Sequence, residues 1–484
     1  MIKDNIKVHD NFSIEIKLIY ENIFKKKKTR YDTITYLFVP NGLNINSQTY
    51  TQAKFYNDVK VYIRYEAPYY ELNELLELAT SPLNNLNAIA YQLNSKKATK
   101  QRRLELQSAT KMLGAVLNKA LIAKISDIKK HKEQNIPAFL QLLDKVITDY
   151  RNIIKRYDKI NKDPKRILEL GDEYISNITS YYLINFHQYC LDNNVNNESL
   201  QEIVKFISEE QKYRKARDYD IDNEDDFYDE SLLYKRSQLK KYIESVLFLN
   251  RDVRKDGTFF EQSVFAISAG IAMIFSTAIA FYYQSIYGNF TLPFFVALVI
   301  GYMFKDRIKS LVGMMFISRA NSLFYDYKVK IKDAKNNNIG KIKENFTFVP
   351  LNKLGPKVKI HRFKENLLQT DYDLNGEQII QYKKKITLYP GKFGKEISDS
   401  RLNNLVDITR INLYRFISQM DDPKRKYSLV KKGKIITRVG NRVYHINIIQ
   451  KFYTENGIEF KRYRVIMNRK GIKRIEKVDL DYIY

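Results

Sequence analysis

A run of 43 residues without a charged side chain, from Gln262 to Phe304, constrains the fold of this chain more than any other feature. No Lys, Arg, Asp, Glu or His occurs in it, although 28% of the 484 residues are charged. A helix that crosses the ~30 Å hydrocarbon core of a bilayer needs ~20 apolar residues. The run is too long for one such helix and about right for two. We therefore expect a membrane protein with two water-facing parts.

The run divides into two predicted helices, at about 263–283 and 286–304. Backbone groups in hydrocarbon must be bonded internally, so a helical hairpin is the expected structure. A hairpin that does not fully cross, and a helix pair buried in a soluble core, are the alternatives. The residues that interrupt the apolar pattern are Gln284, Ser285, Gly288 and Asn289.

Small residues recur every four positions in both predicted helices, at Ala272, Ser276 and Ala280 and at Ala297 and Gly301. Such stripes let two helices approach closely. The stripes predict either packing within the hairpin or a homodimer of two hairpins.

Basic residues flank the apolar run on both sides, whereas the predicted loop around 284–289 is uncharged. Positive residues beside membrane helices stay in the cytoplasm, so we expect both large regions and both termini there. The membrane-flanking residues are Arg251, Arg254, Lys255, Lys305, Arg307 and Lys309.

The composition and the first 20 residues predict the cellular compartment of the protein. The abundance of Lys, Asn, Ile and Tyr is typical of an AT-rich bacterial genome, and the first 20 residues show no secretory signal. The single cysteine, Cys190, excludes an internal disulfide framework and fits a reducing compartment. We expect a multi-pass protein of the plasma (inner) membrane of a bacterium.

Apolar periodicity predicts an α+β fold in four parts. Alternating apolar residues predict strands between residues 12 and 66, and helical spacing predicts helices from 71 to 250. Ile308–Phe316 predicts an amphipathic helix along the membrane interface. The four parts are 1–68, an N-terminal β-rich domain; 69–250, a cytoplasmic helical bundle; 251–327, the transmembrane hairpin with the interfacial helix; and 328–484, a basic C-terminal domain of antiparallel strands with one helix.

Two segments determine the predicted layout of the C-terminal domain. Val358–Phe363 is predicted as a strand. Arg401–Met420 is predicted as the single helix, because its apolar residues recur at helical spacing before Asp421-Asp422-Pro423 ends it.

Positive charge is concentrated in the C-terminal region. Residues 328–484 hold 36 Lys and Arg against 16 Asp and Glu, an excess of 20 in a chain of net charge +27. We expect this region to bind anionic lipid head groups; nucleic acid and an acidic protein are the alternatives. The anionic-surface residues are Lys383, Lys384, Lys385, Lys424, Arg425, Lys426, Lys431, Lys432, Lys434, Arg469, Lys470, Lys473 and Arg474.

An acidic segment, Asp218–Glu230, resembles the carboxylate spacing of a calcium loop. Asn223 replaces the turn glycine, and Asp229 stands where a bidentate Glu is needed. An acidic loop that contacts the basic domain, or a plain solvated loop, are the other interpretations. We assign no metal to this segment.

Other short motifs carry no chemistry by themselves. His187 and Cys190 share a helix face but offer too few zinc ligands, so a buried core cysteine is expected. Glu459–Lys461 resembles half of a metal-dependent nuclease site, and Gly391–Lys395 lacks the spacing of a phosphate-binding loop. No hydrolase or metalloprotease motif occurs. We therefore assign no catalytic residue and no cofactor.

The hairpin resembles that of uncharacterised bacterial membrane proteins. Asn289–Phe294 and the YMFKDRIK segment from Tyr302 to Lys309 carry the resemblance, together with Met420–Pro423 and Arg442–His445. The resemblance implies a two-helix membrane hairpin and no activity.

The function that these features favour is a membrane-anchored scaffold or sensor that faces the cytoplasm and binds a protein partner. The alternative is a membrane-tethered effector or enzyme that acts on nucleic acid or lipid. A flat basic face would favour the scaffold. A pair of carboxylates converging with basic residues in one cleft would favour the enzyme.

Overall fold

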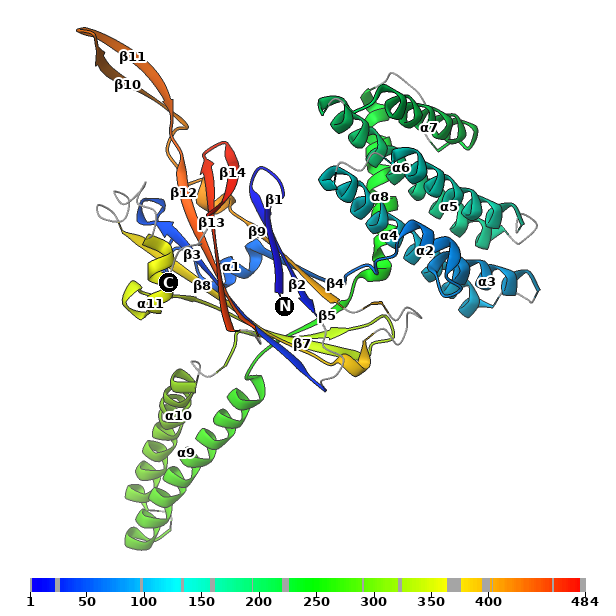
Figure 1. The fold of residues 1–484 in the computed structure, drawn as a ribbon. Coiled ribbons are helices and arrows are strands. Elements are labelled where there is room, and N and C mark those ends of the chain that lie inside the picture. The colour runs from blue at the N-terminus through cyan, green and yellow to red at the C-terminus, as the bar shows by residue number, and fades with distance from the viewer. Residues whose placement is uncertain are drawn as a thin grey trace. The chain divides into compact units, whose positions relative to one another are not determined.

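The computed structural model describes residues 2–21, 27–95, 99–131, 135–156, 162–193, 195–219, 226–289, 291–320, 324–363, 376–393, 401–402, 404–454 and 457–478. The chain forms two compact units (Figure 1). The sheet unit comprises Met1–Val61, Asn250–Lys392 and Asp407–Tyr484. The helical unit comprises Tyr62–Leu249 and Phe393–Val406. The α+β fold class predicted from the sequence is confirmed.

Two sheets form most of the sheet unit. The larger has the strand order β14-β13-β12-β3-β8-β7-β6-β5, and each neighbouring pair is antiparallel. The smaller has the order β1-β2-β9-β4, and β10 pairs with β11 alone. The strands are β1 Ile2–Val8, β2 Ser13–Glu21, β3 Thr29–Pro40, β4 Val59–Tyr65, β5 Asn250–Lys255, β6 Tyr327–Lys332, β7 Asn338–Phe348, β8 Glu377–Leu388, β9 Asn404–Asn412, β10 Lys424–Lys431, β11 Lys434–Asn441, β12 Tyr444–Thr454, β13 Gly457–Asn468 and β14 Gly471–Val478.

The two sheets pack face to face through the side chains that alternate along each strand. The ring of Tyr20 on β2 lies 5.3 Å from the ring of Tyr31 on β3. Lys384 of β8 donates to the carboxylate of Asp407 on β9 at 2.7 Å and to the hydroxyl of Thr409 at 2.6 Å. Lys384 is 4% exposed and Asp407 is 0% exposed, so this ion pair lies inside the core between the sheets.

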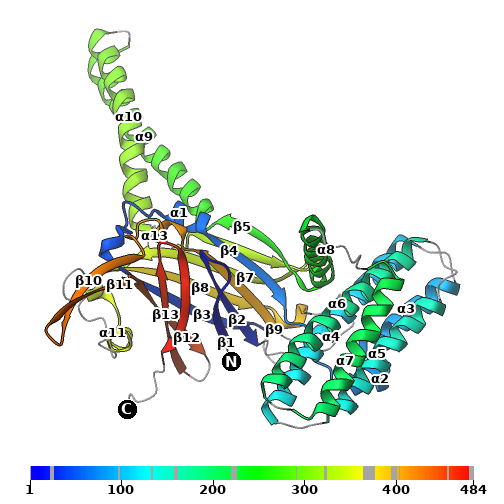
Figure 2. The ribbon, with the colours of Figure 1, turned by 90° about the horizontal axis from the view of Figure 1, so that it is seen from above.

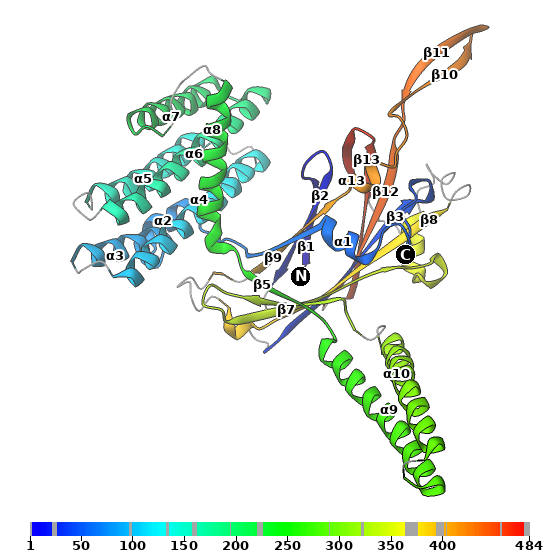
Figure 3. The same ribbon diagram turned by 180° about the vertical axis from the view of Figure 1, so that it is seen from behind.

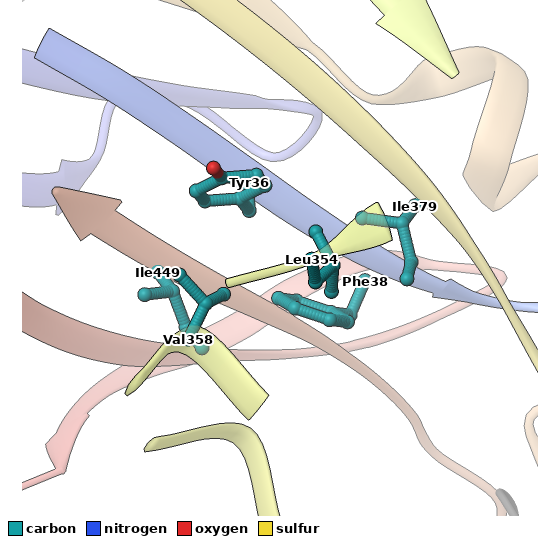
Figure 4. Close-up of a cluster of buried hydrophobic side chains, with 6 residues drawn as sticks. All are labelled: Tyr36, Phe38, Leu354, Val358, Ile379 and Ile449. Atoms are coloured by element: carbon teal, nitrogen blue, oxygen red, sulfur yellow. The ribbon is translucent and has the colours of Figure 1, made fainter. Parts of the chain in front are cut away.

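The outer face of the larger sheet is divided into two zones. At one end, Leu354 and Val358 cover Phe38, Ile379 and their apolar neighbours (Figure 4). Val358 belongs to helix α11, Pro356–Phe363. The other end of the same face, across β5 to β8, carries lysines and is described below.

The central position of β3 changes the predicted domain boundaries. This N-terminal strand lies between β12 and β8, two strands of the C-terminal region. Residues 1–68 and 328–484 were predicted as separate domains, but their strands share one sheet. The sequence does not predict this pairing, because the strands that pair with β3 lie hundreds of residues away.

Two predicted elements are wrong. Arg401–Met420 is not one helix: it contains strand β9 and the short helix α13, Tyr414–Ile417. β-branched residues from Val406 to Ile411 fit a strand, whose inward side chains Asp407 and Thr409 meet Lys384. Val358–Phe363 is helical, because Pro356 begins a helix whose Val358 packs on the sheet.

In the helical unit, helices α2 to α8 follow one another between residues 72 and 244, within the range for which the sequence predicts helices. At its centre, the buried carboxylate of Asp172 accepts hydrogen bonds from Tyr213 at 2.6 Å, Tyr219 at 2.8 Å and Arg151 at 3.2 Å. Arg151 also pairs with Glu210 at 2.6 Å. The helices are α2 Leu72–Glu77, α3 Pro82–Ser95, α4 Lys100–His131, α5 Ile136–Arg156, α6 Lys162–Asp192, α7 Asn197–Ala216 and α8 Asp226–Glu244.

Three further helices belong to the sheet unit. Helix α1, Gln52–Asp58, packs Phe55 against Phe346 of β7 with ring centroids 4.3 Å apart. Helices α9, Thr258–Tyr287, and α10, Leu292–Ala320, lie side by side as a hairpin (Figure 2). This hairpin is inserted between the paired strands β5 and β6.

Candidate membrane-binding surface

The α9–α10 hairpin presents large apolar side chains to its surroundings. Phe259 is 84% exposed, Ile274 is 71% exposed and Leu292 is 76% exposed. In water, exposed apolar area of this extent is unfavourable by ~25 cal/mol per Å². A surface of this kind marks a site of contact with lipid or protein.

Within the described part of the chain, α9 alone is long and apolar enough to cross a bilayer by length and composition. Only 17% of its most apolar 18-residue stretch is buried. The second predicted span, 286–304, is not supported as a spanning helix. Helix α9 continues through Gln284 and Ser285 to Tyr287, and α10 begins at Leu292. This leaves 13 residues before Lys305, or ~20 Å of apolar helix.

Small residues hold the two helices together. A side chain added at Gly301 of α10 would meet Ser276 and Ile279 of α9, and one added at Gly313 would meet Phe265 and Ser268. Ala272 is fully buried. The stripe of small residues predicted from the sequence therefore lies in the contact between α9 and α10.

This packing fixes the level of the charged segment Lys305–Lys309. Because Gly301 lies beside Ser276 and Gly313 beside Ser268, the charges of α10 lie next to the α9 segment between these two serines. The predicted interfacial helix, Ile308–Phe316, is not separate either, since it continues α10. The uncharged end of the hairpin is therefore its tip half, which comprises α9 from about Ser276 onward and α10 up to Phe304.

The predicted membrane-flanking residues differ in their contacts. Arg251 donates to the carbonyl of Val61 at 2.7 Å and lies 3.7 Å from Glu344, so its contacts are with strand residues and not with the hairpin. Arg254 pairs with Asp252 at 3.2 Å, and Lys255 pairs with Glu261 at 2.8 Å. On α10, the ammonium group of Lys305 lies 4.1 Å from the ring of Tyr302. Arg307 and Lys309 are exposed.

A second feature lies where the hairpin joins the sheet. Lysines occupy every other position of β6 and neighbouring positions of β7 and β8, all on the outer face of the larger sheet. The alternate residues, such as Val329 and Ile342, are fully buried. We name this surface the lysine face; it consists of Lys328, Lys330, Lys332, Lys341, Lys343, Lys383 and Lys385.

Like charges stand directly opposite each other on this face. Lys330 pairs with Lys341 across β6 and β7, and Lys343 lies between Lys328 and Lys385. Directly opposed like charges destabilise a sheet. Burial lowers the pKa of Lys341, and the positive charges of Lys328, Lys343, Lys28 and Arg30 lower it further.

Few carboxylates neutralise the lysine face. Lys343 pairs with Asp256 at 2.7 Å, Lys332 lies 3.5 Å from Asp252, and Lys385 lies 4.0 Å from Asp32. No ion pair joins Lys328, Lys330, Lys341 or Lys383 to a carboxylate in the described part of the chain.

The pair β10–β11 forms a third charged feature, which we name the basic arm (Lys424–Asn441). It extends away from the strands of the larger sheet (Figures 1 and 3), and nearly all of its residues are exposed. Its apolar residues Val430 and Ile435 are 76% and 77% exposed. Asp421, which pairs with Arg442 at 2.8 Å, and Tyr444 tie its base. The arm carries the predicted residues Lys424, Arg425, Lys426, Lys431, Lys432 and Lys434, and none of them has an acidic partner among the described residues.

The remaining predicted anionic-surface residues are scattered. The prediction for Lys384 is wrong, because this side chain is buried against Asp407 and cannot contact an anionic surface. Its neighbours Lys383 and Lys385 point the other way, onto the lysine face. Arg469 and Lys470 form the β13–β14 turn, and Lys473 and Arg474 follow in β14. Arg469 lies 3.4 Å from Asp422, and Arg474 lies 2.7 Å from Glu476.

Sequence reasoning missed most of the lysine face, because it looked for runs of adjacent basic residues. The signal was an alternation of lysine with apolar residues, as in Tyr327–Lys332 and Gly340–Lys343. In a strand, alternation places every lysine on one face.

The short motifs give no site in the described residues. No group of three or more His, Cys, Asp or Glu side chains there could hold a metal ion. Residues 220–225 of the acidic segment lie outside the described residues, and Asp229 is on helix α8. Cys190 is buried, which raises its thiol pKa, and Lys461 contacts Asp4. Gly391 and Lys392 form a turn, and residues 394–400 are outside the described residues.

One cleft of about 620 Å³ opens in the sheet unit beside α1 and α13. It contains a single carboxylate, Asp58, which receives hydrogen bonds from Arg415 at 3.0 Å and Tyr50 at 3.0 Å. Burial and then Asp58 raise the pKa of Tyr50. This cleft lacks the converging carboxylate pair that an enzyme of the predicted kind would need.

Comparison with known proteins gave no match to a family model, to a curated protein or to a solved structure.

Proposed function

We propose that the α9–α10 hairpin anchors this protein in a lipid bilayer, and that the protein acts as a membrane-bound scaffold or sensor for a protein partner. The observation that carries the proposal is the exposed apolar surface of the hairpin. The small residues of the hairpin already lie in the contact between α9 and α10. That packing leaves Phe, Ile, Leu and Met side chains pointing outward. It also disfavours a homodimer through the same stripe.

The hairpin inserts tip first, with Lys305, Arg307 and Lys309 at the level of the head groups. Beyond that level α10 supplies ~20 Å of apolar helix, less than the ~30 Å hydrocarbon core. The hairpin therefore enters and leaves from one side. Both large units and both termini then remain in the cytoplasm, at the inner membrane of a bacterium.

The lysine face supports a scaffold over an enzyme. It is a basic surface on one face of a sheet, and in the cleft beside α1 the single carboxylate already accepts a hydrogen bond from Arg415. A second function, that of an effector acting on nucleic acid, is favoured by the basic arm alone. A two-stranded ribbon can enter the major groove of a duplex, and this arm is positively charged along its length.

Carbonate extraction and cysteine labelling test the anchor. The full-length protein should stay in the membrane fraction at high pH. Ala278→Arg and Leu298→Arg, both on the tip side of Lys305, should each weaken insertion by up to ~2.5–3.5 kcal/mol, whereas Val430→Arg, at an exposed apolar position of the basic arm, should have no effect. Release of the unmodified protein by carbonate would contradict insertion.

A cysteine at Asn289 reports how far the tip reaches. We expect an impermeant thiol reagent outside intact cells to leave it unlabelled, since the apolar segment is too short to cross. Strong external labelling would show that the hairpin crosses and would replace this geometry with a two-span one. Cys190 is buried and adds little background.

A further inference from the structure

We propose that the cleft beside α1 and α13 binds a phosphate monoester of a small organic molecule. This inference goes beyond the proposed function, because the cleft lies within the sheet unit and its ligand does not require insertion of the hairpin.

The loop from Asn44 to Tyr50 forms one wall of this cleft and is held by its own side chains. The side-chain oxygen of Asn46 accepts hydrogen bonds from the backbone N–H groups of Gln48 at 2.9 Å and Thr49 at 3.1 Å. Asn46 then donates through its NH₂ group to the side-chain oxygen of Asn44 at 3.0 Å. The oxygen of Asn44 is thus occupied, and its NH₂ group meets no acceptor in the described part of the chain. This wall offers a donor to a ligand.

The opposite wall, around α13, also offers donors. The side-chain oxygen of Asn412 accepts a hydrogen bond from the backbone N–H of Tyr414 at 2.7 Å, and its NH₂ group has no acceptor among the described residues. Arg415 donates through Nε to Asp58 at 3.0 Å, and Asp58 also accepts a hydrogen bond from Tyr50 at 3.0 Å. The side chain of Asp58 is only 13% exposed, so it fixes the guanidinium group. Neither terminal nitrogen of Arg415 meets an acceptor on any residue that the structure describes.

Donors are therefore in excess in this cleft, and two of them carry positive charge. Lys54 donates to the carbonyl of Thr49 at 2.8 Å and has further N–H groups to offer. Asn44, Asn412 and Arg415 contribute the others, while the single carboxylate of the cleft is already bound on both sides. A matching ligand supplies negative charge and several acceptor oxygens. A phosphate group does so, and arginine binds it through parallel hydrogen bonds.

The size of the cleft and one aromatic ring favour an ester over inorganic phosphate. The cleft holds about 620 Å³, within the ~300–1,000 Å³ of small-molecule sites, so a phosphate group fills only part of it. The ring of Tyr414 is 57% exposed and is held against Phe12 with ring centroids 5.5 Å apart. A sugar or a base attached to the phosphate can pack on this ring.

Calorimetric titration of the full-length protein in detergent micelles tests the proposal. The probes are adenosine monophosphate, glycerol phosphate, inorganic phosphate, adenosine, glycerol and succinate. At least one of the two esters should bind at one site per chain and more tightly than inorganic phosphate. Adenosine and glycerol should not bind, and succinate, which carries carboxylates in place of the phosphate, should bind more weakly than the ester.

Variants with matched changes of charge test the residues. Asn412→Asp keeps the oxygen that accepts from Tyr414 but replaces the free NH₂ group by a carboxylate oxygen, so the ester should bind at least tenfold more weakly. Lys54→Gln, at an exposed side chain, and Arg415→Lys, which keeps a cation beside Asp58, should each weaken binding about tenfold. Lys431→Gln on the basic arm removes the same unit of charge and should leave binding unchanged.

Four results would overturn the proposal: no binding of either ester, tighter binding of succinate, unchanged binding by Asn412→Asp and Lys54→Gln, or equal weakening by Lys431→Gln. The last result would assign the binding to general attraction by the net charge. Thermal unfolding followed by circular dichroism shows whether each variant is folded. If Asn412→Asp is unfolded, Lys54→Gln decides, because its side chain lies outside the core. The titration needs no bilayer, so its outcome is independent of carbonate extraction, which tests the anchor.

Discussion

Consecutive lysines of β8 lie in two opposite environments, one inside the core and the other on the outer face of the larger sheet. Lys384 points between the sheets and is fully paired, whereas Lys383 and Lys385 point outward. The alternation of a strand thus turns one run of three lysines into a structural ion pair and part of a basic surface. The same run read as sequence alone shows three equivalent charges.

Removing one partner of the buried pair should be costly. Lys384→Met leaves Asp407 buried without its cation, and we expect a loss of ~3–5 kcal/mol in the free energy of unfolding. Lys384→Met/Asp407→Leu should recover most of this loss. The control is Lys385→Met, whose partner Asp32 is 4.0 Å away and exposed, and which should cost ~1 kcal/mol or less. Urea denaturation followed by circular dichroism measures all three; equal losses for Lys384→Met and Lys385→Met would contradict the assignment.

The polar network around Asp172 predicts an alkaline transition. Burial, and then the hydrogen bond to Asp172, raise the pKa of Tyr213 to about 12. A phenol whose pKa is raised on folding stabilises the protein below its unfolded pKa of ~10, and this stabilisation is lost as the pH rises to about 12. Tyr213→Phe should therefore be less stable than the wild type at pH 8, and the difference should shrink between pH 10 and 12. Urea midpoints across this range measure it, and a constant difference would contradict the prediction.

Among the elements, the two hairpins that leave the larger sheet behave differently. The α9–α10 hairpin satisfies its backbone internally and packs along its length. The basic arm is a two-stranded ribbon with both faces exposed, and such ribbons are marginally stable in water by themselves. Its turn, at Lys432 and Gly433, has the two positive φ angles that favour a tight hairpin.

The basic arm should be the first site of tryptic cleavage in the sheet unit. Low local stability and a high density of Lys and Arg both favour this result. Limited proteolysis with mass spectrometry should find early cuts between Lys424 and Arg438, ahead of cuts at Lys383 or Lys385. A bound acidic partner or nucleic acid should slow them. Survival of the arm after cleavage within β8 would show that the arm is more rigid than its contacts indicate.

The sequence predicts elements well where they are local. The strands β2, β3 and β4, the helices between residues 71 and 250 and the apolar helices are all predicted from periodicity, because the pattern lies within each segment. The helix predicted at Arg401–Met420 failed, because the strands that pair with β9 are β2 and β4, hundreds of residues away in the sequence. The order of strands could not be read either, because β3 meets β8 and β12 through contacts across hundreds of residues.

The candidate site was predictable in part. The apolar run and its flanking charges were visible in the sequence, but the level of Lys305 relative to Ser276 depends on how α9 packs on α10. The lysine face needed the pairing of β6, β7 and β8, which brings seven lysines from three segments together.

At the scale of the whole molecule, the sheet unit is discontinuous in sequence. It uses residues from both ends of the chain, and the helical unit is inserted between them. A fragment of residues 328–484 lacks β3 and so leaves β8 and β12 with open edges. Unpaired edges of this kind favour aggregation.

We therefore expect residues 328–484 to be insoluble or protease-sensitive when expressed alone. Co-expression of residues 1–61 should improve its solubility, because this segment supplies β3 together with β1 and β2. Solubility and resistance to protease measure the effect. A soluble, resistant fragment without residues 1–61 would show that the C-terminal strands form a sheet of their own.

The place of β3 also sets an order of events during synthesis. The ribosome completes β3 about 400 residues before β12, its neighbour, an interval of ~20–80 s at 5–20 residues per second. The α9–α10 hairpin leaves the ribosome within that interval, before β6, β7 and β8 exist. A nascent chain would therefore meet the bilayer while β3 still waits for its partners. If the hairpin inserts as proposed, insertion would precede closure of the sheet, and the lysine face would be assembled on a chain that is already anchored.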